Sequence, residues 1–138
     1  MDFTAAAAMT STERSHTNKG SGNLSAQDHE VLQRLLWVLE EFKDLRPGIQ
    51  VHMVAALVRV ALNEGKSVAE LTRDAGQPQS VMSRSLLDLG PMTRDREPGL
   101  QLVEHRLSPM NMRQHEMHLT KKGGTFMRKI ASFLTTRS

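Results

Sequence analysis

The chain has 138 residues, a formal net charge of +3 and no cysteine. This length suits a single domain, and the lack of cysteine excludes disulfide bonds, thiolate catalysis and cysteine-bound zinc. The sequence has no run of about 18 apolar residues and no secretory signal pattern, so we expect a cytoplasmic protein without a membrane segment.

The positive charge is concentrated at the carboxyl-terminal end. Residues 101–138 contain seven basic and two acidic side chains, whereas the residues before them sum to a charge of −2. A local excess of this kind suits phosphate groups, although a basic surface taken alone is more often only a solvated one. Composition is therefore compatible with nucleic acid as a partner but does not identify it.

Residues 1–24 are rich in small and polar residues, so we expect a disordered tail. A first helix is predicted over about 25–43, with Ser25 as its N-cap. Its apolar residues share one face at helical spacing. They are Val31, Leu32, Leu35, Leu36, Val38, Leu39 and Phe42. Trp37 lies off this face and is either incidentally exposed or an anchor for a second surface.

A turn at 43–48 precedes a second predicted helix over about 49–62. Pro47 can stop the first helix and open the next one, and Asn63–Gly65 supplies a stop signal. The expected buried stripe of this second helix consists of Val54, Leu57, Val58, Ala61 and Leu62.

Two short helices follow, over 67–76 and 78–89. Ser67 and Glu70 have the spacing of a capping box, and Gly76 closes the first helix of the pair. In the second helix, the residues expected to face inward are Met82, Ser85, Leu86 and Leu89. Two short helices joined by a tight glycine turn are typical of a helix-turn-helix.

The outward side of helix 78–89 is polar. Its candidate DNA-contacting residues are Gln77, Gln79, Ser80, Ser83 and Arg84. Arginine can bond guanine with two hydrogen bonds and glutamine can do the same to adenine, and the amino-terminal part of a recognition helix is the part that meets the groove. Small polar residues are equally ordinary on a helix surface, so this face alone does not establish DNA binding.

The charged segment 91–99 is expected to be an extended link to a β-hairpin over 102–119. Strands are predicted at 102–106 and 115–119, with a last helix over about 121–135 that Thr120 caps. The apolar face of that helix consists of Phe126, Met127, Ile130, Ala131, Phe133 and Leu134. The predicted fold class is mainly α with a small β-hairpin wing, a winged helix-turn-helix.

The segment from Asn111 to Gly123 resembles the wing signature of the multiple-antibiotic-resistance regulator (MarR) family of bacterial winged-helix transcription factors. That signature is Asp-x-Arg, five residues, then Leu-Thr-x-x-Gly, and its spacing is intact here. The chain departs from the pattern at Asn111, where the family has Asp. The likeness covers roughly residues 26–134.

This resemblance implies that Arg113 enters the minor groove while the exposed face of helix 78–89 reads bases in the major groove. It also implies a symmetric homodimer, built from the first and last helices, that binds palindromic double-stranded DNA. Arg106, on the first strand of the wing, is a further candidate for DNA contact. We therefore expect a transcription regulator, most simply a repressor.

No set of residues has the spacing of a catalytic site, so we expect neither an enzyme nor a cofactor. We also expect no metal site, because His115 and His118 should point to opposite faces of a strand, which disfavours a cluster with His105. The sequence identifies no small-molecule effector. The alternative function is a protein-interaction module that docks on transcription or replication machinery through Trp37.

Overall fold

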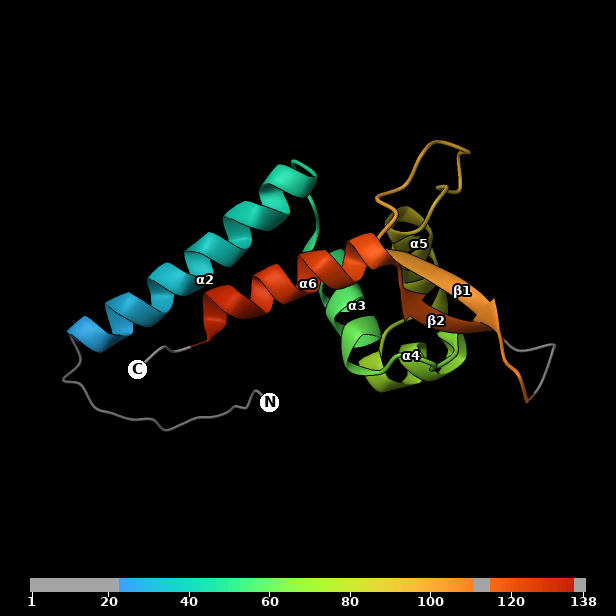
Figure 1. The fold of residues 1–138 in the computed structure, drawn as a ribbon, viewed down its shortest axis with the longest axis horizontal. Coiled ribbons are helices and arrows are strands. Elements are labelled where there is room, and N and C mark those ends of the chain that lie inside the picture. Colours follow the sequence, from blue (N-terminus) through green and yellow to red (C-terminus); the bar gives the residue numbers. More distant parts are fainter. Residues whose placement is uncertain (1–22, 111–114, 136–138) are drawn as a thin grey trace. The chain divides into compact units, whose positions relative to one another are not determined.

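The computed structural model describes residues 23–110 and 115–135. In these ranges it contains five helices and one two-stranded antiparallel hairpin (Figure 1). The helices are α2 (Ala26–Leu45), α3 (Val51–Leu62), α4 (Val68–Ala75), α5 (Gln79–Leu89) and α6 (Lys121–Leu134), and the strands are β1 (Val103–Leu107) and β2 (His115–Leu119). The predicted fold class is confirmed. Residues 1–22 of the predicted tail lie outside the described ranges.

The chain divides between Leu36 and Trp37 into two compact units, and α2 crosses this boundary. The helix begins as predicted: the Ser25 hydroxyl accepts a hydrogen bond from the Asp28 N–H (3.0 Å), and the Ser25 N–H donates to the Asp28 carboxylate (2.9 Å). The bond from the Ser25 N–H favours the charged carboxylate and lowers the pKa of Asp28. The apolar residues on α2 in this first unit are Val31, Leu32, Leu35 and Leu36, and they are 44–55% exposed.

The second unit contains a buried core from all of its helices and from the hairpin. Its most buried residues include Phe42 of α2, Leu57 and Val60 of α3, Leu71 of α4, Met82 and Leu89 of α5, and Leu102, Val103 and Met117 of the hairpin region. The rings of Phe42 and Phe126 meet edge to face, with centroids 5.2 Å apart, so the end of α2 packs on α6.

Helix α3 buries a face that is rotated from the predicted one and shares only Leu57 with it. Its buried residues are Met53, Ala56, Leu57 and Val60, whereas Leu62 is 76% exposed. Almost every residue of this helix is apolar, so several faces satisfy helical spacing equally well. Packing against α5, a long-range contact, decides between them.

The connection between α2 and α3 also differs from the prediction. Helix α2 continues to Leu45, and α3 begins only at Val51, after the N-cap Gln50. Pro47 therefore stops one helix but does not open the next. Gly48 adopts a left-handed conformation with φ of 78° that reverses the chain.

The helix-turn-helix forms as predicted from its local signals. The Ser67 hydroxyl accepts from the Glu70 N–H (3.1 Å), and the Glu70 carboxylate accepts from the Ser67 N–H (2.9 Å). The latter bond lowers the pKa of Glu70. Gly76 ends α4 with φ of 65°, and the four predicted inward residues of α5 are all buried.

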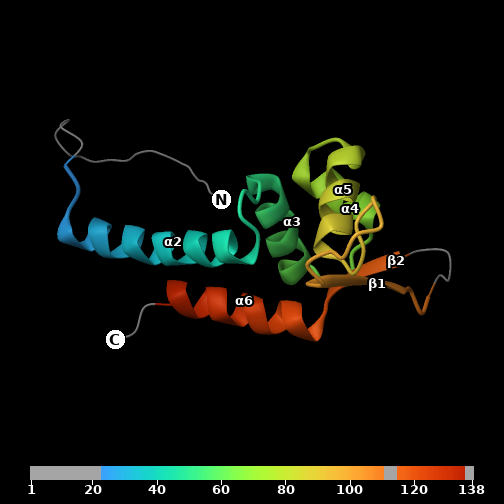
Figure 2. The same cartoon turned by 90° about the horizontal axis from the view of Figure 1, so that it is seen from above.

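Strands β1 and β2 pair in the register Val103↔Leu119 and Leu107↔His115, and the hairpin lies beside α4 and α5 (Figures 1 and 2). Segment 91–99 is not the extended link that we expected. The Thr93 N–H donates to the Glu97 carbonyl (2.7 Å) and Met92 pairs with Pro98, so the segment folds back on itself. No helix in the described part of the chain is long and apolar enough to cross a membrane.

Candidate nucleic-acid interface

Helix α5 presents a polar, solvent-facing side opposite its buried residues. Gln79, Ser80 and Arg84 are exposed on this side, whereas Ser85, Leu86 and Leu89 face the core. The exposed set contains an amide, a hydroxyl and a guanidinium, which are groups that form hydrogen bonds with base edges. Three of the five predicted contact residues of this helix region are thus accessible to a ligand.

The other two predicted residues of this region are less accessible. Gln77 is half-buried, and its amide nitrogen lies 3.9 Å from the sulfur of Met82. Ser83 is half-buried and lines a hollow of about 230 Å³ together with His105 and Met117 of the hairpin. Ser83 therefore lies where α5 meets the hairpin.

Of the two arginines predicted as contact residues on the hairpin, the structure describes only Arg106. Arg106 is exposed, and its Nε and terminal nitrogen bond the Glu104 carboxylate at 3.0 and 2.6 Å. Because neighbouring residues of a strand alternate between faces, Arg106 points away from the strand face that carries His105. Arg113 and Asn111 lie outside the described residues.

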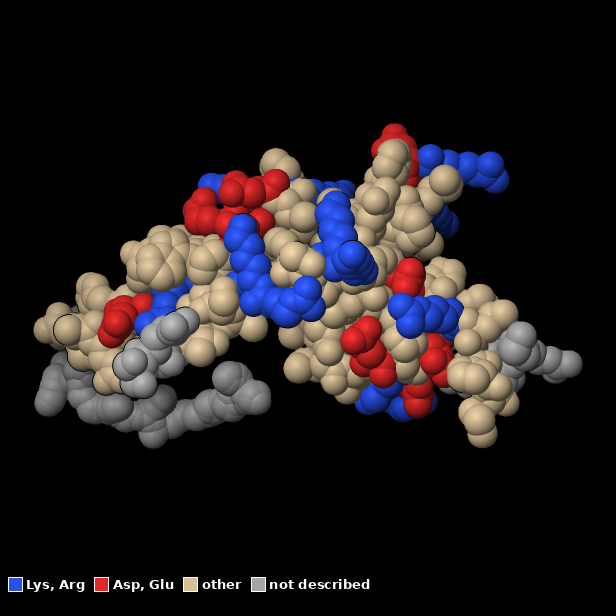
Figure 3. Space-filling model, in the orientation of Figure 1, with Lys and Arg blue, Asp and Glu red and all other residues tan. Residues whose placement is uncertain are grey.

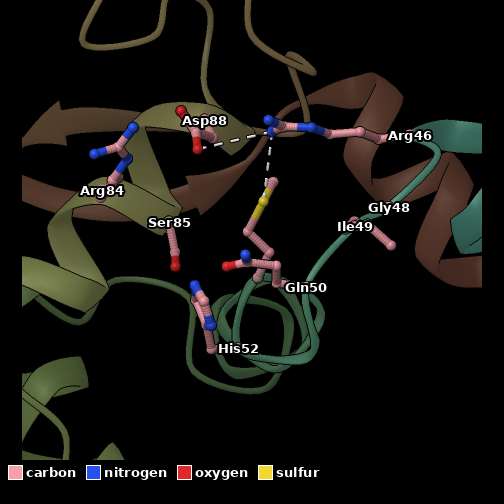
Figure 4. A pocket seen from close by; sticks show the side chains of 9 residues that line it. Arg46, Gly48, Ile49, Gln50, His52, Arg84, Ser85 and Asp88 are labelled. Carbon is pink, nitrogen blue, oxygen red and sulfur yellow. Dashed lines mark hydrogen bonds and ion pairs between the residues drawn. The ribbon is translucent and has the colours of Figure 1, made fainter.

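A polar cavity of about 380 Å³ opens beside α5 (Figure 4). Arg46 of the α2–α3 connection spans part of it and bonds both Asp88 of α5 (3.7 Å) and the sulfur of Met53 (3.6 Å). Arg84 also lines the cavity, as do Gln50, His52 and Ser85. Guanidinium, imidazole and amide nitrogens line it together with the Asp88 carboxylate, which already pairs with Arg46.

Sequence reasoning did not find this cavity. Arg46 and Asp88 are 42 positions apart in the sequence, and neither belongs to a recognisable motif. Among its lining residues, the sequence had singled out Arg84 as an outward contact residue and Ser85 as an inward one. The remainder depends on the position of the α2–α3 connection beside α5.

Replacing Ser85 by alanine is expected to leave stability unchanged or to raise it by about 1 kcal/mol. The side chain is 1% exposed, and its hydroxyl has no hydrogen-bond partner among the described residues. A buried hydroxyl without a partner loses its hydration, and alanine is also the better helix former. Urea denaturation of the parent and of Ser85→Ala measures this difference; a loss above about 1 kcal/mol would mean that the hydroxyl forms a stabilising bond.

Basic side chains also line α6. On the face in Figure 3 they gather along this helix, which carries Lys121, Lys122, Arg128 and Lys129. Lys129 pairs with Glu41 (2.9 Å), and the Lys122 ammonium donates to the Leu100 carbonyl (3.1 Å). Part of the carboxyl-terminal charge excess therefore stabilises the fold.

The chain matches no known family model and no protein of established function in a sequence search. Among solved structures, it is similar to a MarR-family transcription regulator with 25% identity over 77% of this chain and 65% of the other, at a TM-score of 0.51. It is also similar to a MarR transcriptional regulator from Methanosarcina mazei, with 15% identity over 78% and 70% of the two chains and a TM-score of 0.54.

A third similar structure is the complex of S. aureus MepR with DNA, with 18% identity over 76% of each chain and a TM-score of 0.55. Identities this low show a common fold. The predicted likeness to MarR-type winged-helix regulators is thereby confirmed at the level of architecture.

Proposed function

We propose that the chain is a sequence-specific DNA-binding transcription regulator, a cytoplasmic homodimer that represses by occluding promoter DNA. In this proposal α5 reads the major groove, and the wing over 102–119 contacts the adjacent minor groove through Arg113. The protein acts by binding and not by catalysis. The described residues contain no cluster of three or more potential metal ligands.

The observation that carries the proposal is the two-sided character of α5. One side completes the core, while the other exposes Gln79, Ser80 and Arg84 next to a β-hairpin. A helix of this kind, with a wing beside it, is suited to lie in a groove while the wing contacts the neighbouring backbone. The MepR structure, of the same fold, is a complex with DNA.

Selection of bound sequences from a random DNA pool tests this function. The expected product is an inverted repeat with half-sites about one helical turn apart, because a two-fold symmetric protein selects a two-fold symmetric site. Recovery of no common sequence would contradict base reading by α5.

Arg84→Ala is expected to weaken binding to the selected site by on the order of 1–3 kcal/mol and to relax the preference at one base position. Arg84 forms no ion pair within the described residues, so its guanidinium is available for a base. Arg106→Ala is the matched comparison. Its effect should be smaller, because Arg106 must first leave Glu104.

Gel-shift titrations of both variants at two salt concentrations measure these effects. Arg106 and Arg113 are assigned to the phosphate backbone and minor groove, so their replacement should weaken all sequences evenly and reduce the salt dependence. If Arg84→Ala binds the selected site as tightly as the parent does, the assignment of α5 as the reading helix is wrong.

The exposed apolar residues of α2 support the homodimer. Val31, Leu32 and Leu35 lie on one side of this helix and are about half exposed. A second copy of the same helix would cover such a face in an isologous contact.

The alternative, docking on another protein through Trp37, is supported by the 48% exposure of that ring. Binding to DNA that collapses with added salt favours the first function, and salt-insensitive capture of a polymerase subunit favours the second.

A further inference from the structure

Two histidines of the hairpin meet across the strands. The Nδ1 atoms of His105 and His115 lie 3.2 Å apart, and the two ring centroids are 5.1 Å apart. His105 pairs with Met117 and His115 pairs with Leu107, so the histidines are diagonal neighbours on one strand face. Both side chains are exposed. His105 and His115 are called the histidine pair.

The separation of the two nitrogens fits adjacent ligands of one metal ion. If an ion lay at the usual metal–imidazole distance of 2.0–2.1 Å from both nitrogens, the nitrogen–metal–nitrogen angle would be roughly 100–106°. That value lies between the ideal octahedral and tetrahedral angles. Without an ion, the same distance allows a hydrogen bond when one Nδ1 carries a proton and the other does not.

His118, on the same hairpin, does not join the pair. It lies on the opposite strand face, where its Nε2 is 3.2 Å from the Glu116 carboxylate and its Nδ1 is 3.7 Å from that of Glu64. His115 and His118 therefore lie on opposite strand faces, as their spacing predicts. The expectation of no metal site was argued against a cluster of all three hairpin histidines. A site formed by His105 and His115 alone does not need His118.

The surroundings of the pair leave room for water ligands. The two histidines line a hollow of about 360 Å³ with Ser67, Val68 and Ala69 at the start of α4. No third histidine or carboxylate completes the set among the described residues. An ion bound here would keep water in its other positions, and two imidazoles favour zinc, nickel or copper over magnesium or calcium.

We propose that His105 and His115 bind one divalent transition-metal ion, and that this ion links β1 to β2 in the half of the hairpin nearer its tip. The ion would link residues ten positions apart in the sequence, immediately beside the hairpin tip. Linking the strands there reduces the number of open conformations of the hairpin. The site does not depend on DNA, so it can be tested independently of the proposed function.

The test is calorimetric titration of the metal-free full chain with ZnCl₂ and NiCl₂ near neutral pH. The expected result is one ion per chain, with binding weakened at least about tenfold in His105→Ala and in His115→Ala. His118→Ala is the matched control, since it removes an imidazole from the same hairpin but from the other face. MgCl₂ should give no binding heat.

Amide hydrogen exchange provides a second measurement. Zinc is expected to slow exchange in β1 and β2 of the parent and of His118→Ala, and to have no effect in His105→Ala or His115→Ala. Both histidines are exposed, so these variants should keep the circular dichroism spectrum of the parent. Absence of zinc binding in the parent, or zinc binding that survives replacement of His105 and of His115, overturns the proposal.

Discussion

Gly123→Ala is expected to destabilise the protein by about 3 kcal/mol or more, a large share of the stability of a domain of this size. Gly123 is buried in the first turn of α6, which crosses directly over the backbone of Leu102. An added Cβ would collide with the Leu102 carbonyl oxygen and lie only 2.9 Å from its carbonyl carbon. Backbone cannot rotate aside as a flexible side chain can, so α6 itself would have to shift.

The contacts around Gly123 make such a shift costly. The Thr120 hydroxyl accepts from the Gly123 N–H (2.9 Å) and donates to the Gln101 carbonyl (2.7 Å), and the Thr120 N–H donates to the Leu102 carbonyl (3.0 Å). One threonine thus caps α6 and ties it to the segment before β1. Moving α6 away from Leu102 would stretch these bonds together.

Gly124→Ala is the matched control for Gly123→Ala. The nearest atom to a Cβ at Gly124 is the end of the flexible Arg128 side chain, at 3.5 Å. Alanine there should be neutral or stabilise the helix by up to about 1 kcal/mol. Thermal and urea unfolding of the two variants measure the contrast; equal stabilities would mean that α6 does not need glycine where it crosses Leu102.

This contact also gives a physical meaning to the Leu-Thr-x-x-Gly part of the wing signature. The sequence reveals the spacing of Thr120 and Gly123, and local rules predict the cap at Thr120. The need for glycine arises from the crossing of two segments some 20 residues apart. Only the assembled fold reveals that reason.

Local signals predicted most of the fold correctly. Ser25, Ser67 and Thr120 cap helices as expected, and Gly76 ends α4 in the left-handed conformation. These features depend on residues within one turn of each other, so sequence alone is sufficient to identify them. The inward face of α5 was predicted for the same reason, because polar and apolar residues alternate clearly along it.

Predictions failed where long-range packing decides between alternatives. The uniformly apolar α3 offers no unique periodicity, and its contact with α5 selects the buried face. The cavity at Arg46 and the histidine pair each join residues from different elements. The pair depends on the exact hairpin register, and a slip by one residue would turn His105 and His115 to opposite faces.

Leu35→Glu is expected to convert the proposed homodimer into a monomer and to abolish tight binding to an inverted repeat. Leu35 is 44% exposed. Val31 and Leu39 lie one turn before and one turn after it on the same side of the helix, and they are 55% and 51% exposed. Full burial of a leucine contributes about 1.5–3 kcal/mol, and an unpaired carboxylate buried in its place costs several kcal/mol more. In a two-fold symmetric interface the substitution occurs twice.

Analytical ultracentrifugation over a range of protein concentrations measures this effect. The dissociation constant of the dimer should rise at least about 100-fold, while the circular dichroism spectrum should keep its helical signature, because Leu35 is not part of the buried core. Gln33→Glu adds the same charge outside the apolar stripe of α2 and should leave the dimer intact. If the parent is monomeric at all concentrations, or if Leu35→Glu dimerises like the parent, the exposed face of α2 is not a homodimer interface.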